Sequence, residues 1–182
     1  MASKSKKIYI GKSKLHGRGI FVSRDIKKGG RIMTLVGKEV KHLIVSPTVA
    51  KRISVNIMGV GKNKWIDPQK REWVFFNHSC NPNTAIKNQI QVTALRNIKK
   101  DEEITFDYST TEADIFWSMK CYCKEKNCRK TIKSIQFLPS NVFKKYSENI
   151  SKYYKMIYIR FNRRKFKSLV ELRKAWVLFL LN

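Results

Sequence analysis

Acidic residues are scarce in this sequence. Asp and Glu total 13 against 39 Lys and Arg, so the formal net charge is +26 over 182 residues. A field of that sign favours polyanions, and nucleic acid, the ribosome or an anionic membrane surface are the candidate partners. A lysine-rich proteome in which the charge has little functional meaning is the alternative. Apolar residues make up 42%, which is enough for a core, and the length predicts one domain with an appendage.

Long apolar runs are missing as well. No segment reaches the ~18 apolar residues that a membrane span needs, and "WVLFLL" at 176–181 is far too short. The N-terminal "MASKSKKIYIG" is charged and lacks the apolar stretch of a secretory signal. We therefore expect no membrane span and an intracellular protein. In a reducing compartment, clustered cysteines hold metal more often than they form disulfides.

Cysteines are few and unevenly placed. Cys121, Cys123 and Cys128 lie together in "CYCKEKNC", whereas Cys80 stands well before them in "FFNHSCNPN". Three thiolates leave one position of a tetrahedral zinc site open, and Cys80 is the remaining cysteine that can close it. A closed four-sulfur site has no place for water, so the spacing predicts one structural zinc that fastens the C-terminal loop to the central domain. Four free or redox-active thiols are the alternative.

Basic residues surround the three later cysteines. A Zn²⁺ ion with four thiolates has a net charge of about −2. Nearby cations offset that charge and favour the thiolate form of cysteine. The sequence supplies five of them, namely Lys120, Lys124, Lys126, Arg129 and Lys130.

The chain up to about residue 108 reads as many short strands. Segments rich in β-branched and aromatic residues alternate with Gly-containing turns, which predicts a mainly β domain of small sheets. The expected strands are 7–11, 19–23, 31–37, 55–60 and 64–68, with a hairpin at 85–98 and a turn plus strand at 99–109. Between them, 46–54 is expected to be a loop or short helical turn, and 71–84 a short helical or extended run that ends in a polar loop.

Residues 130–182 differ in composition, with 13 basic and 2 acidic residues. Their apolar spacing predicts helices at 147–161 and 167–181. Aromatic and basic residues interleave in "RFNRRKFKS" at 160–168, where cations could neutralise phosphates while Phe161 and Phe166 stack on bases. The solvated face of a packed helix is the alternative interpretation.

Four motifs follow one another in a familiar order: "GRGIF" (17–21), "NHSCNPN" (77–83), "EITFDY" (103–108) and "CYCKEKNC" (121–128). Over roughly residues 8–132 the sequence resembles a SET-domain protein methyltransferase with a post-SET cysteine loop. The resemblance implies the SET fold, in which small curved sheets surround a threaded C-terminal segment. It also implies a SET domain at 1–108, a post-SET zinc-binding loop at 109–132 and a basic, helical C-terminal extension at 133–182.

The resemblance implies methyl transfer from S-adenosylmethionine to a lysine side chain of a protein substrate. Cofactor and lysine would enter a narrow channel from opposite faces. Histones or other nucleic-acid-associated proteins are the expected substrates, with contact to chromatin, nucleic acid or ribosomes through the basic surface. The expected location is the nucleus, on chromatin, or the cytoplasm. The resemblance also places the cysteine of "NHSC" on one zinc with the three post-SET cysteines.

Residue roles transfer by position. Tyr108 corresponds to the family's catalytic tyrosine, while Phe106 reads as core. The expected cofactor-binding residues are the glycine turn Gly17, Arg18 and Gly19, the pair Asn77 and His78, and Tyr122 and Ile132 as covers of the adenine ring. Each assignment has a structural alternative. The glycine turn could be a plain β-turn, His78 a structural histidine, and Tyr122 and Ile132 ordinary packing residues.

Methyl transfer needs a neutral amine. A free lysine has a pKa of ~10.4, and a tenfold change in a protonation equilibrium corresponds to ~1.36 kcal/mol, so neutralising that lysine at pH 7 costs roughly 4–5 kcal/mol. A dry aromatic channel and the adjacent sulfonium charge both lower its pKa. No general base is required, and the sequence shows no Ser-His-Asp or paired-carboxylate arrangement.

Two positions depart from the family pattern. Leu35 stands where a tyrosine normally lines the lysine channel, and Thr93 stands near a position that often carries Phe or Tyr. A wider or differently polar channel is expected, which leaves the number of methyl groups open. These departures and the charge motivate a second hypothesis, a nucleic-acid-binding module on a catalytically degenerate SET scaffold.

Overall fold

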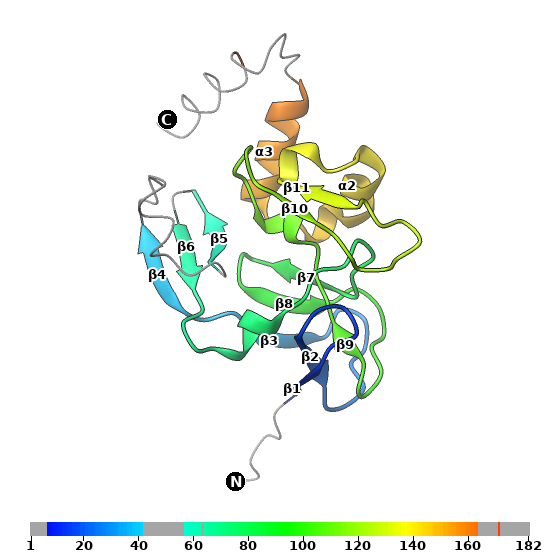
Figure 1. The fold of residues 1–182 in the computed structure, drawn as a ribbon. Helices are drawn as coiled ribbons and strands as arrows, with labels where there is room; N and C mark the ends of the chain where they lie inside the picture. The colour runs from blue at the N-terminus through cyan, green and yellow to red at the C-terminus, as the bar shows by residue number, and fades with distance from the viewer. Residues whose placement is uncertain (1–6, 42–56, 63, 164–170, 172–182) are drawn as a thin grey trace.

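The computed structural model describes residues 7–41, 57–62, 64–163 and 171. Within them the chain forms short strands in small sheets, with few helices (Figure 1). The predicted mainly β class is therefore confirmed. No helix in this described part is both apolar enough and long enough to cross a membrane.

The first sheet joins the N-terminal strands to a late one. Its order is β1 (Ile8–Lys12), β2 (Arg18–Val22) and β9 (Glu103–Ile104), all antiparallel. Ile20 pairs with Ile104 across it, and both side chains are fully buried. Removing such a side chain from water stabilises the fold by roughly 1.5–3 kcal/mol. This sheet therefore fixes the glycine turn near the "EITFDY" segment.

Two further three-stranded sheets and one hairpin complete the β structure. One sheet has the order β3 (Arg31–Thr34), β8 (Gln91–Ala94), β7 (Thr84–Lys87), and the other β4 (Lys38–Lys41), β6 (Lys64–Asp67), β5 (Met58–Gly61). A hairpin pairs β10 (Ser118–Lys120) with β11 (Thr131–Lys133). The buried faces of the three sheets share one apolar core.

The C-terminal part adds helices. They are η3 (Ile135–Phe137), α2 (Ser140–Tyr146), η4 (Ser147–Asn149) and α3 (Lys152–Arg163). In α3 the buried residues Tyr154, Ile157 and Tyr158 follow the i, i+3, i+4 spacing of one helix face. They form a second core with Ile135 and its neighbours.

A parallel contact places the Asn-His segment beside the catalytic candidate. His78 and Phe106 form an isolated parallel bridge, in which Ser79 N donates to Phe106 O at 3.2 Å and Phe106 N donates to Asn77 O at 3.2 Å. Two short 3₁₀ helices lie next to this contact, η1 (Glu72–Phe75) before it and η2 (Tyr108–Thr111) after it. The bridge therefore brings together two segments that lie far apart in the sequence.

Most predicted elements are found, with differences at their ends. The strand expected at 31–37 ends at Thr34, and Leu35, which follows it, is almost fully buried. The helix expected at 147–161 begins only at Lys152, after η4. The β10–β11 hairpin and α2 were not predicted. The expectations for 46–54, for 55–56 and for 167–181 as a helix concern residues outside those described, apart from residue 171.

Candidate active site and thiol cluster

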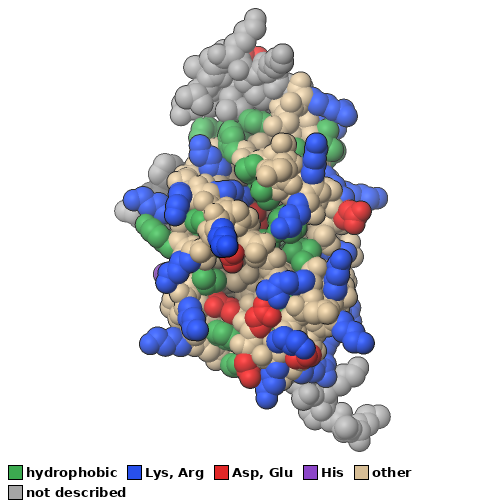
Figure 2. Space-filling view, turned by 90° about the vertical axis from the view of Figure 1, so that its right-hand side faces the viewer, with side chains coloured by type: hydrophobic (Ala, Val, Ile, Leu, Met, Phe, Trp, Pro, Cys, Tyr) green, Lys and Arg blue, Asp and Glu red, His purple; other side chains and the backbone are tan. Residues whose placement is uncertain are grey.

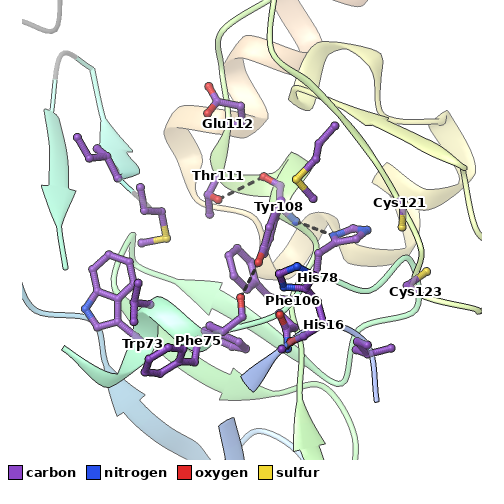
Figure 3. Close-up of a pocket in the computed structure, with 18 of the residues that line it drawn as sticks. His16, Trp73, Phe75, His78, Phe106, Tyr108, Thr111, Glu112, Cys121 and Cys123 are labelled. Carbon is purple, nitrogen blue, oxygen red and sulfur yellow. Dashed lines mark hydrogen bonds between the residues drawn. The ribbon is translucent and has the colours of Figure 1, made fainter. Parts of the chain in front are cut away.

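A cavity of about 850 Å³ lies where the glycine turn, β5, η1, η2 and the cysteine loop meet (Figure 3). Its walls include seven aromatic side chains, namely Trp73, Phe75, Phe76, Phe106, Tyr108, Trp117 and Tyr122. Aromatic walls exclude water and lower the local dielectric constant, which disfavours a charged amine. The cavity therefore has several of the aromatic walls that the sequence led us to expect, together with charged residues such as Arg18 and Lys120.

Tyr108 lies on the wall of this cavity at the start of η2. Its hydroxyl donates to the carbonyl oxygen of Phe76 at 2.7 Å, and its main-chain N–H donates to Nδ1 of His78 at 3.2 Å. Burial raises the pKa of the Tyr108 phenol to about 12, and the charge of Glu103 adds to the effect. The phenol therefore stays protonated at neutral pH, as a fixed hydrogen-bonding group.

Asn77 holds the glycine turn in place. Its Nδ2 donates to the carbonyl oxygens of His16 at 3.3 Å and Arg18 at 3.0 Å. The same nitrogen lies 2.8 Å from Oε1 of Glu103, which also accepts a hydrogen bond from Ser13. Glu103 was missed from the sequence, although its place within "EITFDY" in a chain poor in acids was a usable signal.

The predicted glycine turn reaches the cavity at two of its three positions. Gly17, with a φ of 50°, and Arg18 line the cavity, and the Arg18 guanidinium stacks on the Phe75 ring at 3.8 Å. Positive φ is costly for residues with a Cβ, so Gly17 suits the turn. Gly19 is not among the lining residues. A Cβ there would collide with the Glu103 carboxylate, so this glycine makes room for Glu103.

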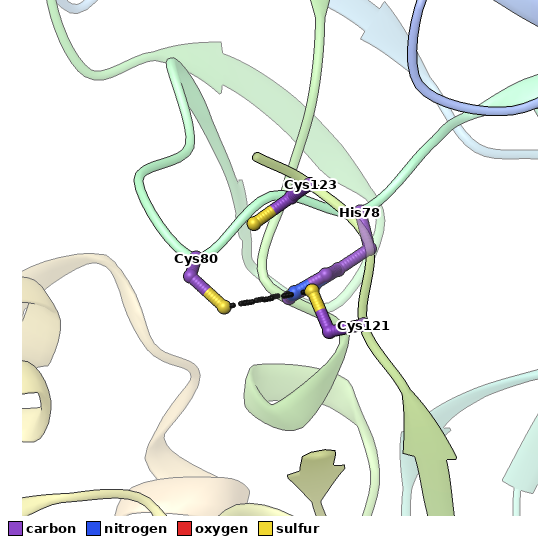
Figure 4. A group of neighbouring side chains, drawn as sticks. All are labelled: His78, Cys80, Cys121 and Cys123. Carbon is purple, nitrogen blue, oxygen red and sulfur yellow. Dashed lines mark hydrogen bonds between the residues drawn. The ribbon is translucent and has the colours of Figure 1, made fainter. Parts of the chain in front are cut away.

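The separated cysteine does meet the later ones. Donor atoms of His78, Cys80, Cys121 and Cys123 all lie within 4.8 Å of one another, and all four residues are buried (Figure 4). The Sγ atoms of Cys80 and Cys121 are 3.8 Å apart. A tetrahedron with Zn–S bonds of ~2.3 Å has sulfur–sulfur edges of ~3.8 Å, so the spacing fits a zinc site.

Cys128 lies at the edge of this group. Its Sγ is 3.6 Å from the carbonyl oxygen of Cys121, and its side chain packs against the buried cysteines and Ile132. It does not belong to the set of four mutually close donors, in which His78 takes its place. The role of Cys128 as the fourth ligand remains a prediction.

His78 faces the thiols with one ring nitrogen and the main chain with the other. Its Nε2 is 3.4 Å from Cys80 Sγ. Burial lowers the pKa of His78 to about 4, which the nearby Asp107 opposes and Arg129 reinforces. The ring is therefore neutral, with Nδ1 toward the main-chain N–H of Tyr108 and Nε2 toward the Cys80 sulfur. In this geometry His78 links the thiol cluster to Tyr108 and also lines the cavity.

Arg129 also faces Cys80. Its main-chain N and its Nε each lie 3.4 Å from Cys80 Sγ. Burial raises the pKa of the Cys80 thiol, while the contacts with Arg129 oppose that rise. The sequence suggested only a general offset of charge by five cations, and the structure identifies Arg129 as one that touches a sulfur.

The two residues predicted to cover the adenine ring lie in different surroundings. Tyr122 lines the cavity and is 71% exposed, so its ring is available to a ligand. Ile132 is fully buried against the cysteines and is not among the lining residues, and its role beside the adenine ring remains a prediction. It alternates with exposed neighbours along β11, so its side chain points to the interior.

Of the two residues that depart from the family pattern, only one lines the cavity. Leu35 lines the cavity, as expected. Thr93 does not, and its hydroxyl lies 3.4 Å from the carbonyl oxygen of Ala85 within the β7–β8 pair. Among the described residues, only Leu35 therefore stands on the cavity wall at a position where the sequence led us to expect a missing aromatic side chain. Thr93 is not on that wall.

Comparison with known proteins now gives the family. Residues 17–109, just over half of the 182, match the SET domain family, and the chain belongs to it. The variant-silencing SET domain-containing protein of Plasmodium falciparum is 33% identical over 141 residues, 68% of this chain. The H3 lysine-36 specific histone-lysine N-methyltransferase of Debaryomyces hansenii is 31% identical over 132 residues, 65% of this chain.

Solved structures support the fold. KRYPTONITE in complex with mCHG DNA and SAH superposes with a TM-score of 0.54 at 22% identity, over 68% of this chain and 28% of that one. Its complex with mCHH DNA, H3(1-15) peptide and SAH gives a TM-score of 0.52 at 22% identity, over 68% and 29%. At this identity the likeness establishes the SET fold. The chain spans only 6% and 18% of the length of the two relatives above.

Proposed function

We propose that this chain is an S-adenosylmethionine-dependent protein-lysine methyltransferase. The observation that carries the proposal is the partly buried, protonated Tyr108 on the wall of the cavity, beside a turn that Asn77 holds. Relatives named histone-lysine N-methyltransferases and structural neighbours solved with SAH support it. The cofactor would lie against Gly17, Arg18, Asn77 and His78, with Tyr122 beside its rings.

The reaction is a displacement at carbon. S-adenosylmethionine supplies an electrophilic methyl group on a sulfonium. The lone pair of a neutral lysine Nζ forms the new N–C bond while the C–S bond breaks with its electrons on sulfur, and the methylated ammonium loses a proton to water. The chain contributes alignment and exclusion of water. Because the Tyr108 phenol stays protonated, it orients groups by hydrogen bonding and does not act as a base.

The thiol cluster would hold one structural zinc. Buried thiols with these sulfur distances suit Zn²⁺, and a closed site has no position for substrate. Cys80 and the three post-SET cysteines are the proposed ligands, with Cys128 completing the set. The ion would bind the cysteine loop to the wall of the cavity that carries His78.

The expected substrates are histones or other nucleic-acid-associated proteins, which implies work on chromatin in the nucleus. The support is the relatives' names and the H3(1-15) peptide in one structural neighbour. Incubation with tritiated S-adenosylmethionine, zinc and a cell lysate tests the activity, and mass spectrometry of the labelled proteins identifies target, site and number of methyl groups. Failure to label any protein would contradict the proposal.

A nucleic-acid-binding module on an inactive scaffold is the second candidate. The net charge of +26 motivates it, and Figure 2 shows many Lys and Arg side chains scattered over one face, around a group of Asp and Glu side chains. This function predicts salt-sensitive binding to DNA or RNA and no binding of S-adenosylhomocysteine. Calorimetric titration with S-adenosylhomocysteine separates the two, because micromolar binding is expected only of the enzyme.

A further inference from the structure

The β10–β11 hairpin carries an exposed face that methyl transfer does not use. Its strands pair with Ser118 opposite Lys133 and Lys120 opposite Thr131. Because side chains alternate along a strand, these four lie on one face of the hairpin, and all four are exposed. The opposite face packs inward, since Ile132 is fully buried against the cysteines. The four exposed residues are called the hairpin face below.

The hairpin face is positively charged. Lys120 and Lys133 lie on it, and the exposed Lys130 directly precedes β11. Within the described residues, none of these three lysines forms an ion pair. The sequence from 115 to 147 contains eight Lys or Arg and a single acid, Glu125. Such a surface attracts polyanions and binds them with release of counterions.

An aromatic ring lies at the end of the hairpin face. Phe137, in η3, is 38% exposed, and Nζ of Lys133 lies 5.5 Å from its ring centroid. Phe161 of α3 packs edge-on against the same ring, with centroids 5.3 Å apart and an interplanar angle of 72°. The sequence suggested Phe161 and Phe166 as rings that stack on bases. In the structure Phe161 supports Phe137, which presents its ring beside a lysine, and Phe166 lies outside the described residues.

We propose that the hairpin face and Phe137 bind single-stranded nucleic acid. Lys120, Lys130 and Lys133 neutralise successive phosphates, while one base stacks on the Phe137 ring. A duplex keeps the faces of its bases inside the stack, so an exposed ring beside lysines favours a single strand. The partner class comes from the second candidate function, on which the proposal rests, but binding here does not require an inactive scaffold. Of the four residues named, Lys120 also lines the cavity, so the surface reaches the cavity at that end.

Fluorescence anisotropy with labelled oligonucleotides tests this surface. The probes are an oligouridylate and an oligothymidylate of about 12 nucleotides, within the usual span of a single-strand site, and a DNA duplex of the same length. Each is titrated with the full chain and zinc at several salt concentrations. Lys130→Gln combined with Lys133→Gln removes two proposed phosphate contacts, and Phe137→Leu removes the ring but keeps an apolar side chain. Lys27→Gln combined with Lys28→Gln is the matched control, because both lysines are exposed, lie between β2 and β3, and form no ion pair within the described residues.

We expect wild type to bind at least one single strand more tightly than the duplex. The double variant at 130 and 133 should reduce the slope of log K against log salt concentration by about 1.4, because each phosphate contact on a single strand contributes ~0.7. Phe137→Leu should weaken single-strand binding about tenfold and leave the slope unchanged. An equal reduction of the slope in the control pair, duplex binding as tight as single-strand binding, or wild-type affinity in Phe137→Leu overturns the proposal.

Calorimetry with S-adenosylhomocysteine is the fold control and separates this result from the proposed function. None of the substituted residues lines the cavity, so each variant should bind S-adenosylhomocysteine as wild type does. If the double variant does not fold, Lys133→Gln alone should still reduce the salt slope by about 0.7. Methyl transfer by a chain that binds no oligonucleotide, or that binds only phosphatidylserine vesicles, supports the proposed function and contradicts the nucleic-acid surface. Oligonucleotide binding with the expected pattern by an inactive chain does the reverse.

Discussion

Arg129 and Asp107 form a buried ion pair, in which Nη2 of Arg129 donates to Oδ1 of Asp107 at 2.6 Å. Asp107 immediately precedes Tyr108, and its Oδ1 also accepts from Ser109 N at 3.1 Å at the start of η2. Arg129 reaches Cys80 with its Nε. One side chain therefore joins the thiol cluster to the turn that carries the catalytic candidate.

Replacing Arg129 by Gln should destabilise the protein strongly. The substitution leaves the buried Asp107 charge without its partner, and its other oxygen already has none among the described residues. Breaking a buried pair in this way costs about 3–5 kcal/mol of unfolding free energy. Urea denaturation monitored by circular dichroism measures it.

Two companions of this variant sharpen the result. Asp107→Asn combined with Arg129→Gln should recover part of the loss, because no unpaired charge remains. Arg129→Lys should recover only part of it, since a lysine lacks the planar fork that reaches both Asp107 and Cys80. An unfolding free energy of Arg129→Gln equal to that of wild type would show that the pair contributes nothing.

Zinc removal should loosen the cysteine loop. If the thiols hold one ion, the purified protein contains about one zinc per chain by atomic emission, and a chelator lowers its melting temperature, because binding to the native state stabilises that state. Cys80→Ser should lose the metal. The zinc content of Cys128→Ser identifies the fourth ligand. Loss of zinc supports Cys128 as that ligand, and full retention of zinc points to His78.

Tyr108→Phe should reduce methyl transfer roughly 10²–10³-fold, as is typical when one positioned hydrogen-bonding group is removed from an active site. The hydroxyl is lost while the ring packing against Phe106 and His78 is kept. Binding of S-adenosylhomocysteine by calorimetry should stay within about twofold of wild type. Tyr153→Phe is the matched control outside the cavity lining, and an equal loss there would contradict the assignment.

The pH dependence of stability should change in Glu112→Gln. Because burial raises the folded pKa of Glu112, the native state binds more protons than the unfolded state between the two pKa values. The contribution of this carboxyl to stability is present below the unfolded pKa and is lost as pH rises through the folded pKa. Relative to wild type, Glu112→Gln should therefore gain unfolding free energy from about pH 4 to pH 7. If the Glu112 carboxylate instead stabilised the fold, Glu112→Gln would have a lower unfolding free energy than wild type at neutral pH.

The local pattern of the sequence determined most of the elements near the cavity. Alternating apolar residues gave β1, β2 and the β7–β8 hairpin, and the i, i+3, i+4 spacing of Tyr154, Ile157 and Tyr158 gave most of α3. The spacing of the cysteines was enough to expect Cys80 beside Cys121 and Cys123. These features depend on the residue types and spacing within short segments, which can be seen directly in the sequence.

Tertiary structure alone decided which side chains share a site. The sequence marked Arg129 only as one of five cations near the cysteines, and its contacts with Cys80 and Asp107, like the contact of Glu103 with Asn77, follow from the packing of distant segments. The same packing turns Ile132 inward and leaves Tyr122 at the cavity. Such contacts depend on the register and path of segments far apart in the chain, and local periodicity carries no information about either.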